Sequence, residues 1–463
     1  MSADQTVESA LSASRTKPDH VLAIVCSGVV LANLDLFIVN LALPDIARDF
    51  GNASLDDLSW VLNGYAVVYA SLLVFLGRLA ERHRRDRSFL LGVAIFTAAS
   101  AACATAGDVW QLVAFRVLQA AGAALMTPTS LGLLLASYPA EQRGGAVRTW
   151  TAIGGFAGAL GPVVGGLLLT QGWQWIFIVN VPVGLVTVLV GWRMLPKVAG
   201  HDVPRPDAWG AALVTAGVAL LTFGLVKGGD WGWSDRRTGA VLAMGLVLLA
   251  AFVVHCLRSR NPLIDLGLFR DRNFSSASLV MVPFTVVFGA TLLSIILWEQ
   301  EVWGWSPLKT GLACAPGPFL VPITSLFVAG HLIRKLGPAP VVALGLAFFA
   351  GGCLWWALGL GLVPDLLSAV GGIVLTGIGV GLTMPTLMGA AAASLPQSAF
   401  ATGSGALSMI RQTGMAIGVA VLVAVVGMAS TPDEKLAAFR LAWWLMAAGM
   451  ALGAIPCLFI RRK

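Results

Sequence analysis

The stretch GAALMTPTSLGLLLASYP, residues 122–139, decides the fold because it occurs a second time, without gaps, as GVGLTMPTLMGAAAASLP at residues 379–396. The two copies share eight identical residues, among them Gly122/Gly379 and Pro128/Pro385. A weaker similarity at nearly the same spacing relates GRLAERHR (77–84) to GHLIRKLG (330–337). The repeat predicts two homologous halves, an arrangement typical of carriers whose halves rock around a site near the middle of the bilayer.

The composition places both halves in lipid. Only 11% of the residues are charged and 57% are hydrophobic, whereas a soluble domain has about 25% charged residues. The apolar runs are continuous and about 20 residues long, which predicts transmembrane helices instead of the shorter, alternating strands of a barrel. About fourteen such runs are present: 21–43, 57–77, 88–106, 110–137, 146–169, 173–194, 208–227, 238–257, 274–298, 307–331, 340–360, 365–389, 403–428 and 438–460.

The predicted fold class is an all-α membrane protein with 14 transmembrane helices, built as two six-helix halves plus two inserted helices. The runs 208–227 and 238–257 have no counterpart in the repeat, so they are the expected insertion. We predict a cytoplasmic N-terminal tail at 1–20, an N-terminal half at 21–195, a linker with the inserted helices at 196–260, and a C-terminal half at 261–463. The polar tail lacks the early apolar core of a cleavable signal.

The basic residues predict the orientation. With a cytoplasmic N-terminus, the expected inner loops receive most of the arginines, including five within residues 77–87. The positive-inside rule then places both termini in the cytoplasm. Because Arg outnumbers Lys and both Ala and Gly are abundant, we expect a multi-pass protein of a bacterial cytoplasmic membrane. Anionic lipid headgroups explain the net charge of +7 without a nucleic-acid partner.

The sequence lacks the residue patterns of disulfide-bonded proteins, metal sites, common hydrolases and ATP-binding loops. All six cysteines fall inside apolar runs without CxxC spacing, which predicts neither disulfides nor a metal site. The five histidines are scattered, and no HExxH, GxSxG or GxxxxGK[ST] motif occurs. We therefore expect no enzyme, no cofactor and no use of ATP.

At the level of motifs, the sequence resembles the fourteen-helix drug:proton antiporters of the major facilitator superfamily, from the first helix to nearly the last. The resemblance is carried by LDLFIVNLALPDI (34–46), GRLAERHRR (77–85), RVLQAAGAALMTP (116–128), GALGPVVGG (158–166), WQWIFIVNVPVG (173–184), WGWS (231–234) and PLIDLGLFRDRNF (262–274). It implies a major facilitator fold and the efflux of lipophilic drugs, antibiotics or biocides by alternating access, driven by the proton motive force. Protons are then the coupling ion, and a monomer is expected. The alternative is a proton-coupled importer of a small metabolite with the same fold.

The family resemblance assigns a role to the loop between the second and third helices. There Gly77, Arg78, Glu81, Arg82 and Arg85 match a charge relay that holds the two halves together on the cytoplasmic side. The sequence departs from the family by having Glu81 in place of Asp and Arg84 in place of Gly. The alternative is a positive-inside signal without a gating role.

Ionisable residues inside the membrane are the candidates for proton coupling. Asp35 and Arg116 lie at similar distances from the outer ends of their helices, so the two could pair. Desolvation and a nearby guanidinium act in opposite directions on a carboxylate, which would make its protonation responsive to conformation. The resemblance implies a role in coupling and binding for this pair, with Asn40 and Gln119 in the same motifs. The alternative is a purely structural pair.

Glycines mark one face of the fifth helix. Gly154, Gly158, Gly161 and Gly165 follow one another at i, i+4, i+7 and i+11, so another helix can approach closely, and Pro162 introduces a bend. Together with Gly166 they resemble the antiporter signature that is associated with exporters.

Two further charged residues lie within predicted spans. Glu299 sits near three tryptophans, either as a second acid that recognises a cationic substrate or as a wet, interfacial acid in an aromatic belt. Arg411 lies about ten residues into the thirteenth helix, where a lipid-facing guanidinium would be costly. We expect Arg411 to face the central cavity or a partner helix.

Overall fold

The structure, a computed structural model, describes residues 17–51, 53–200, 205–395, 400–427 and 429–459. These ranges form helices and contain no strand. In chain order the elements are α2 Pro18–Asp49, α3 Leu55–Glu81, α4 Arg85–Cys103, α5 Val109–Ser137, α6 Ala140–Leu169, α7 Trp175–Ile178, α8 Asn180–Met194, α9 Ala208–Trp231, α10 Arg236–Arg258, η1 Leu266–Arg270, α11 Arg272–Leu297, η2 Trp298–Val302, α12 Pro307–Cys314, α13 Pro316–Ile323, η3 Thr324–Ala329, α14 Gly330–Leu336, α15 Pro338–Gly359, α16 Leu366–Ser394, α17 Phe400–Val426, α18 Pro432–Gly453 and η5 Ile455–Phe459.

The described residues contain 14 helical spans that are long and apolar enough to cross a membrane. This confirms the predicted all-α fold class. The predicted tail at 1–20 lies mostly outside the described residues, and helix α2 begins within it, at Pro18. This start is favoured because proline is well suited to the first turn of a helix.

The two copies of the repeat occupy corresponding places in the two halves. An added Cβ at Gly122 of α5 would lie 2.8 Å from the carbonyl oxygen of Gly92 in α4. At Gly379 of α16 it would lie 2.7 Å from the carbonyl oxygen of Gly345 in α15. In each half the shared glycine therefore lets a helix pair approach to backbone contact, which explains why this stretch repeats.

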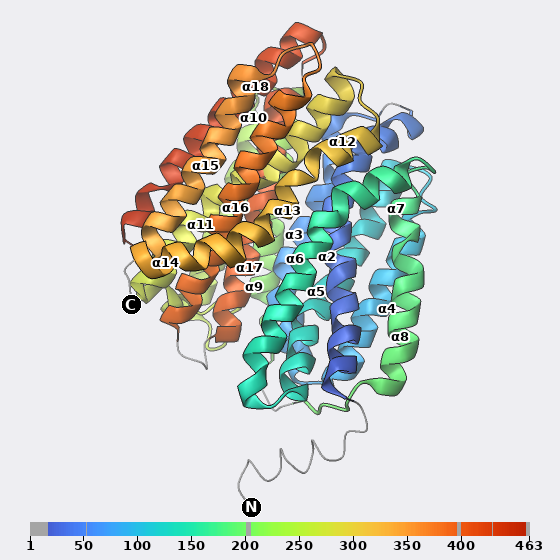
Figure 1. The fold of residues 1–463 in the computed structure, drawn as a ribbon, viewed down its shortest axis with the longest axis vertical. Coiled ribbons are helices and arrows are strands. Elements are labelled where there is room, and N and C mark those ends of the chain that lie inside the picture. The colour runs from blue at the N-terminus through green and yellow to red at the C-terminus, as the bar shows by residue number, and fades with distance from the viewer. Residues whose placement is uncertain (1–16, 52, 201–204, 396–399, 428, 460–463) are drawn as a thin grey trace, which may run out of the picture.

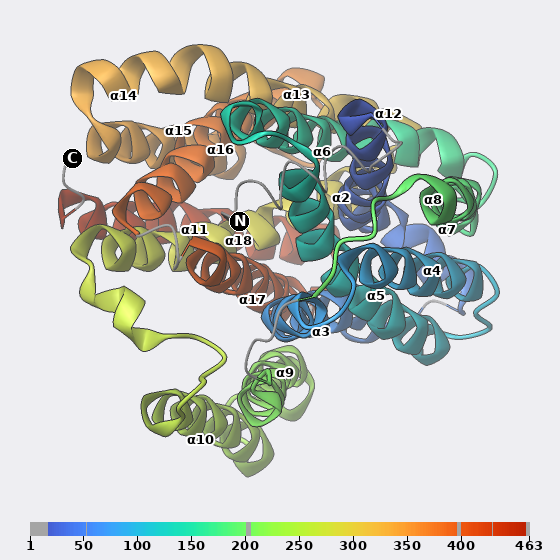
Figure 2. The same ribbon diagram turned by 90° about the horizontal axis from the view of Figure 1, so that it is seen from below.

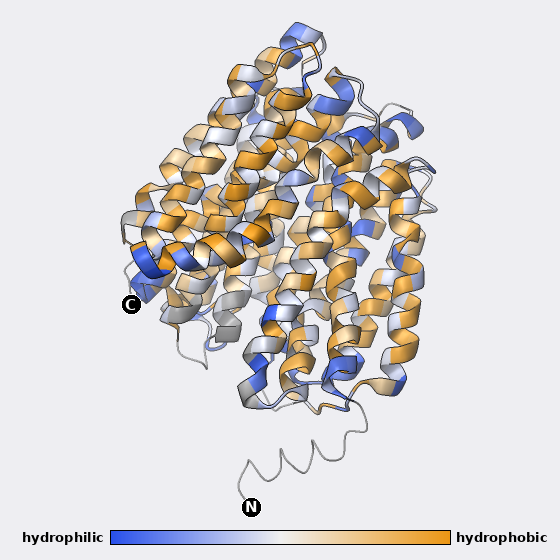
Figure 3. Cartoon of the chain, in the orientation of Figure 1, coloured by the Kyte–Doolittle hydropathy of each residue, from blue (hydrophilic) through white to orange (hydrophobic). Residues whose placement is uncertain are grey.

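Two helical bundles and an attached helix pair make up the molecule (Figure 1). Helices α2 to α8 form one bundle and α11 to α18 the other, and Figure 2 shows α9 and α10 at one edge, beside α3 and α17. Helix α9 contacts both α3 and α17, whereas α10 packs mainly on α9. Large apolar side chains on α10, such as Leu246, Val247 and Leu257, are exposed as in a lipid-facing helix. Figure 3 shows apolar residues along the flanks and polar ones mostly near the ends.

Polar contacts attach the inserted pair at both of its ends. The Lys227 ammonium lies 3.0 Å from Asp230, 3.6 Å from Asp56 and 3.8 Å from Asp57, which connects the end of α9 to the start of α3. At the other end, the Asp207 carboxylate accepts hydrogen bonds from the backbone N–H groups of Gly210 and Leu263, at 2.8 and 3.1 Å. These contacts explain why α9 stays against the seam between the bundles.

The halves contact each other differently at the two ends of the molecule. We call the end that holds the loop 82–84 and the start of α6 the arginine-rich end. There Arg78 Nη1 donates a hydrogen bond of 2.8 Å to the carbonyl of Pro262, at the start of the second half. At the opposite end an added Cβ at Gly166 would lie 2.8 Å from Leu308 Cα, and Gln300 Nε2 donates to the carbonyl of Leu41 at 3.1 Å. Close backbone packing therefore joins the halves at the opposite end.

Candidate functional site

A central cavity of about 590 Å³ lies between the two halves. Its wall is formed by α2, α3, α5 and α6 on one side and by α11, α12, α13, α15, α16 and α17 on the other, and it is mostly apolar and aromatic. Thr151, Gly155 and Pro385 line the cavity and are exposed, whereas Asn40 and Ile296, deeper in the wall, are buried. The cavity is therefore accessible from the arginine-rich end and closed at the opposite end.

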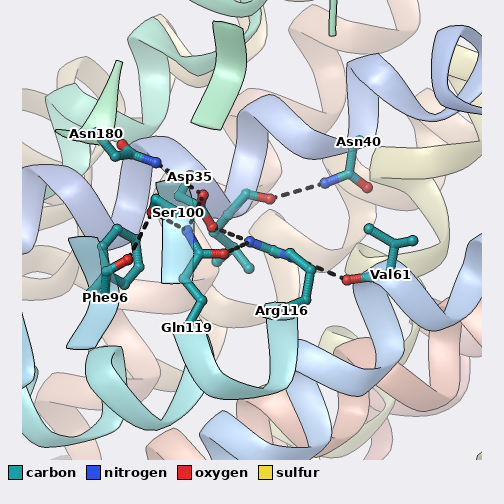
Figure 4. A network of polar contacts seen from close by, with 9 residues as sticks. Asp35, Asn40, Val61, Phe96, Ser100, Arg116, Gln119 and Asn180 are labelled. Carbon is teal, nitrogen blue, oxygen red and sulfur yellow. Dashed lines mark hydrogen bonds and ion pairs between the residues drawn. The ribbon is translucent and has the colours of Figure 1, made fainter. Parts of the chain in front are cut away.

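Asp35 is the centre of a buried polar network beside this cavity (Figure 4). Its side chain is fully buried, and Oδ2 lies 2.5 Å from Nη1 of Arg116. Its other oxygen, Oδ1, accepts hydrogen bonds from Gln119 Nε2 at 2.9 Å and from Asn180 Nδ2 at 3.3 Å. The network thus joins α2 to α5 and to the start of α8, and the predicted pairing of Asp35 with Arg116 is confirmed.

Arg116 keeps several partners besides Asp35. Its Nε donates to the carbonyl of Val61 at 3.2 Å, and Nη1 donates to Gln119 Oε1 at 2.5 Å. Its guanidinium also lies 4.2 Å from the centre of the Tyr65 ring, a cation–π geometry. Loss of the negative charge on Asp35 would therefore leave Arg116 with hydrogen-bond acceptors and an aromatic face.

Tyr65 stands between the network and the cavity. It lines the cavity, and its ring is stacked on that of Tyr69 with the centres 5.8 Å apart. Asp35, Arg116 and Gln119 are not part of the cavity wall. The predicted site residue Asn40 does line the wall, but its amide donates to the Leu36 carbonyl at 3.0 Å and not to Asp35.

Arg411 faces the cavity, as expected. It lies in the wall on α17, next to Gln412, which is also in the wall and is buried. The Nε of Arg411 and the Oε1 of Gln412 are buried without a hydrogen-bond partner in the described part of the chain. Arg411 is the only charged residue in the described cavity wall.

Glu299 lies in a different environment from the wet interface considered above. Its side chain is fully buried, so that interpretation is wrong. The residue belongs to the π-helical turn Trp298–Val302, which directs the carboxyl group towards Cys314, with Sγ and Oε2 4.0 Å apart. Its Oε1 has no hydrogen-bond partner among the described residues. Cys314 lines the cavity, whereas Glu299 is not part of its wall.

The loop 77–87 packs on the first copy of the repeat. An added Cβ at Gly77 would lie 3.4 Å from Pro128, and Arg85 Nη1 donates to the carbonyl of Gly132 at 3.5 Å. The expected acid of the relay, Glu81, and its neighbour Arg82 make no side-chain hydrogen bond or ion pair with any described residue. The gating role of this loop stays a prediction.

The ion pair within this loop involves residues that the sequence analysis did not assign. Arg84 Nη2 lies 2.5 Å from Asp86 Oδ2. This hydrogen bond raises the pKa of the Arg84 guanidinium. The residue that departs from the family pattern, Arg84, therefore has an acidic partner two positions further along the chain.

The glycine face of α6 packs against α2. Added Cβ atoms would lie 2.8 Å from Val29 at Gly154, 2.9 Å from Phe37 at Gly158, 2.7 Å from Phe37 at Gly161, and 2.6 Å from Ile38 at Gly165. The predicted close approach of another helix is confirmed. Gly166 faces the other way, towards α12, and an added Cβ at Gly311 of α12 would meet the carbonyl of Pro162. The same helix therefore contacts α2 with one face and the other half with another.

The sequence analysis missed Asn180, Ser100 and Tyr65. Asn180 stands in the quoted motif WQWIFIVNVPVG, and Ser100 Oγ accepts a hydrogen bond of 2.8 Å from Gln119 Nε2. A polar residue within an apolar span was a usable signal for Asn180. Tyr65 gave no such signal, because tyrosine occurs in many apolar helices.

A family model and individual known proteins are similar to this chain over most of its length. The family model described as Major Facilitator Superfamily matches residues 25–419 and 279–463. The chain is 33% identical over 416 residues to the "Tetracenomycin C resistance and export protein" of Streptomyces glaucescens, covering 85% of this chain and 75% of that protein. It is 30% identical over 447 residues to the "Methylenomycin A resistance protein" of Bacillus subtilis (strain 168), covering 94% of this chain and 92% of that protein.

Solved structures share the fold at low sequence identity. The POT family transporter PepTSo aligns with a TM-score of 0.70 at 14% identity, covering 95% of this chain and 97% of that one. A bacterial homolog of the human lysosomal transporter Spinster, in an inward-facing and unoccupied conformation, also aligns with a TM-score of 0.70, at 17% identity and with 96% and 97% coverage. These likenesses extend over nearly the whole chain.

Proposed function

The chain belongs to the major facilitator superfamily, and from that premise we propose that it exports lipophilic drugs or antibiotics from the cytoplasm in exchange for protons. It is a transport protein and not an enzyme. The observation that carries the proposal is the juxtaposition of a large apolar cavity with the buried Asp35–Arg116 pair. Relatives named for antibiotic resistance and export support the outward direction.

The cavity wall favours lipophilic compounds. Pockets that bind small molecules are typically apolar with a few polar groups, and they have volumes of about 300–1,000 Å³. This cavity, at about 590 Å³, is within that range and exposes mainly side chains such as Phe37, Phe288, Met384 and Met388. Methionine and aromatic side chains adapt to ligands of different shape, which suits a transporter with several substrates.

We infer that the Asp35 carboxyl group is the proton carrier. When Asp35 is ionised, Oδ2 holds Arg116 and Oδ1 holds Gln119 and Asn180, so α2, α5 and α8 are tied together. Uptake of a proton by the carboxylate weakens the contact with Arg116, which retains Val61, Gln119 and Tyr65. The packing of the three helices then depends on whether Asp35 is protonated. Proton uptake is thereby coupled to the change in which end of the cavity is open.

A single chain is sufficient for this mechanism. The cavity wall and the polar network are both formed within one molecule. We therefore propose a monomer in the cytoplasmic membrane, with the arginine-rich end in the cytoplasm according to the positive-inside rule.

Transport into everted membrane vesicles tests direction and coupling together. With the vesicle interior acidified, an exporter that uses protons accumulates a lipophilic dye inside, and collapse of the pH gradient releases it. A proton-coupled importer of the same fold would instead move its substrate out of acid-loaded everted vesicles. No gradient-dependent accumulation of any lipophilic probe, in vesicles that contain the folded protein, contradicts the proposal.

A further inference from the structure

We propose that the central cavity selects lipophilic compounds that carry an acidic group, a carboxylate or a phenolate, and that Arg411 binds this group. The inference rests on the proposed export function, because it names the chemical class of the compound exported. Arg411 is the only charged side chain in the described wall of the 590 Å³ cavity. The charge that a substrate meets there is therefore positive.

The two arginines of this region differ in how their charge is compensated. Arg116 is buried and has the Asp35 carboxylate, the Gln119 amide oxygen and the Val61 carbonyl as partners. Arg411 forms no ion pair or hydrogen bond with any described residue, and its Nε is buried without a partner. The side chain is partly exposed to the cavity, and a guanidinium that is partly desolvated without an anion is unfavourable. An anionic group on the substrate would compensate its charge.

The surroundings of Arg411 fit a lipophilic acid better than an inorganic anion. Ser408, Arg411, Gln412 and Met415 follow one another at i, i+3, i+4 and i+7, so one face of α17 lines the cavity with two further polar side chains and an apolar one. The stacked rings of Tyr65 and Tyr69 on α3, a helix that packs against α17, offer an aromatic surface in the same cavity. A planar ring system can lie against the apolar wall while its acidic group reaches the guanidinium.

This selection has a consequence for the energetics of export. A monoanion that leaves the cytoplasm moves one negative charge outward, and each proton that enters moves one positive charge inward. Both movements are favoured by a membrane potential that is negative inside. Export of an acidic substrate should therefore respond to membrane potential even when the pH is equal on both sides.

Binding of three matched fluorescent probes to the purified protein tests the charge preference directly. The probes are 1-pyrenebutyric acid, 1-pyrenebutanol and 4-(1-pyrenyl)butylamine, which share one ring system and differ in charge. We expect the wild-type protein to bind the acid at least about tenfold more tightly than the alcohol, as for a charge-assisted hydrogen bond. In Arg411→Gln this preference should disappear through loss of acid binding, while the alcohol binds as before.

Two variants control for indirect effects. Arg411→Lys retains the charge and should keep part of the preference for the acid. Thr413→Ser, on α17 but outside the cavity wall, should keep all of it. Arg411→Gln removes a partly buried charge that has no ion-pair partner among the described residues, so its unfolding temperature should not fall below that of the wild type. The inference is overturned if the wild-type protein binds the acid no better than the alcohol, or binds neither. It is also overturned if the amine binds more tightly than the acid.

Vesicle transport separates this inference from the proposed function. Accumulation of the alcohol or the amine but not of the acid, beyond the passive uptake into vesicles without the protein, supports export and overturns the inference. Selective binding of the acid without gradient-driven accumulation of any probe supports the inference and contradicts the export function. Accumulation of the acid that increases with an imposed K⁺/valinomycin potential at equal pH supports both.

Discussion

At the scale of single residues, Asp35 must hold Arg116 and also release it. The carboxylate is fully buried and accepts hydrogen bonds from Arg116, Gln119 and Asn180. If it takes up a proton in every cycle, the protein must tolerate a neutral residue at this position. The remaining partners of Arg116 provide that tolerance.

Asp35→Asn should therefore leave a folded protein that no longer uses the pH gradient. Asparagine keeps the size and the hydrogen-bonding ability of the side chain, but its amide does not bind and release a proton as a carboxyl group does. We expect accumulation in acid-loaded everted vesicles to fall to the level seen without a gradient, while probe binding is retained. Dye uptake with and without the gradient, together with an unfolding curve of the purified variant, measures both effects.

Asp57→Asn is the matched control for this substitution. Asp57 lies at the opposite end in the loosely held cluster around Lys227, where its side chain is 35% exposed. The Asp57→Asn variant should accumulate the dye as the wild-type protein does. Gradient-driven uptake by Asp35→Asn at the wild-type level would assign the coupling proton to another residue, of which the buried Glu299 is the first to examine.

The pairing of Asp35 with Arg116 was predictable, because counting residues from the helix ends gives the depth of each side chain. Gln119 was assigned because it stands in the same motif as Arg116, and its place three positions further along the helix puts both on one face. Asn180 was not assigned because its contact with Asp35 depends on the short break between α7 and α8. The burial of Glu299 depends on a π-helical turn, for which the sequence offered no clear signal.

At the scale of helices, the glycine face of α6 was predictable because helical periodicity is a local property. The interruption of the predicted helix 307–331 was missed. This span is divided into α12, α13, η3 and α14, with Pro316 beginning α13 and Pro322 within it. Proline lacks the backbone N–H that a regular helix needs, while hydropathy alone registers proline as compatible with an apolar run.

Adding one methyl group to α6 should distinguish its two faces. Gly161→Ala would place a Cβ 2.7 Å from Phe37 Cβ and so force α6 away from α2. We expect a loss of about 1–3 kcal/mol of stability, as for other overpacked contacts, and a clear decrease in export. The measurement is the unfolding temperature in detergent together with dye accumulation.

Gly155→Ala serves as the comparison on the same helix. An added Cβ at Gly155 has no atom within 4 Å. Stability and export should remain close to those of the wild type. Equal effects of the two substitutions would mean that helix propensity, and not contact with α2, determines the outcome.

The attachment of α9 gives a second prediction at this scale. Lys227→Met removes the only cation in the described cluster with Asp56, Asp57 and Asp230, and the three carboxylates then repel one another. Because Lys227 is 21% exposed, solvent screens part of the effect, and we expect a loss of about 1–2 kcal/mol. Thermal unfolding measures it. Lys435→Met, which breaks a more exposed pair with Glu301, should have a smaller effect.

At the scale of the whole molecule, the repeat indicated two halves, but which end of the cavity is open could not be predicted. A transporter sequence must be compatible with both arrangements, so no residue pattern selects one of them. In this structure Thr151 and Leu292 line a cavity that is accessible from the arginine-rich end. That choice follows from contacts between the halves at Gly166, Gly311 and Gln300.

Labelling with a membrane-impermeant maleimide should report this accessibility. Thr151→Cys and Leu292→Cys should both react when the reagent is added on the side of the arginine-rich end, and much more slowly from the other side. The native protein is the background control, since all six of its cysteines are buried. Faster labelling from the opposite end would show that the resting protein in a membrane prefers the other arrangement.

The contacts described at the closed opposite end are close-packed backbone at Gly166 and Leu308 and a hydrogen bond from Gln300 to the Leu41 carbonyl, with no ion pair among these residues. Dissolved ions weaken attractions between exposed charges beyond about 8 Å at physiological ionic strength, but they have little effect on van der Waals contact. The arginine-rich end, in contrast, holds several arginines, and one of them, Arg78, donates a hydrogen bond to the other half. A change of salt concentration should therefore alter the closing of one end and leave the opening of the other nearly constant, so the two half-reactions of the cycle have different ionic-strength dependence.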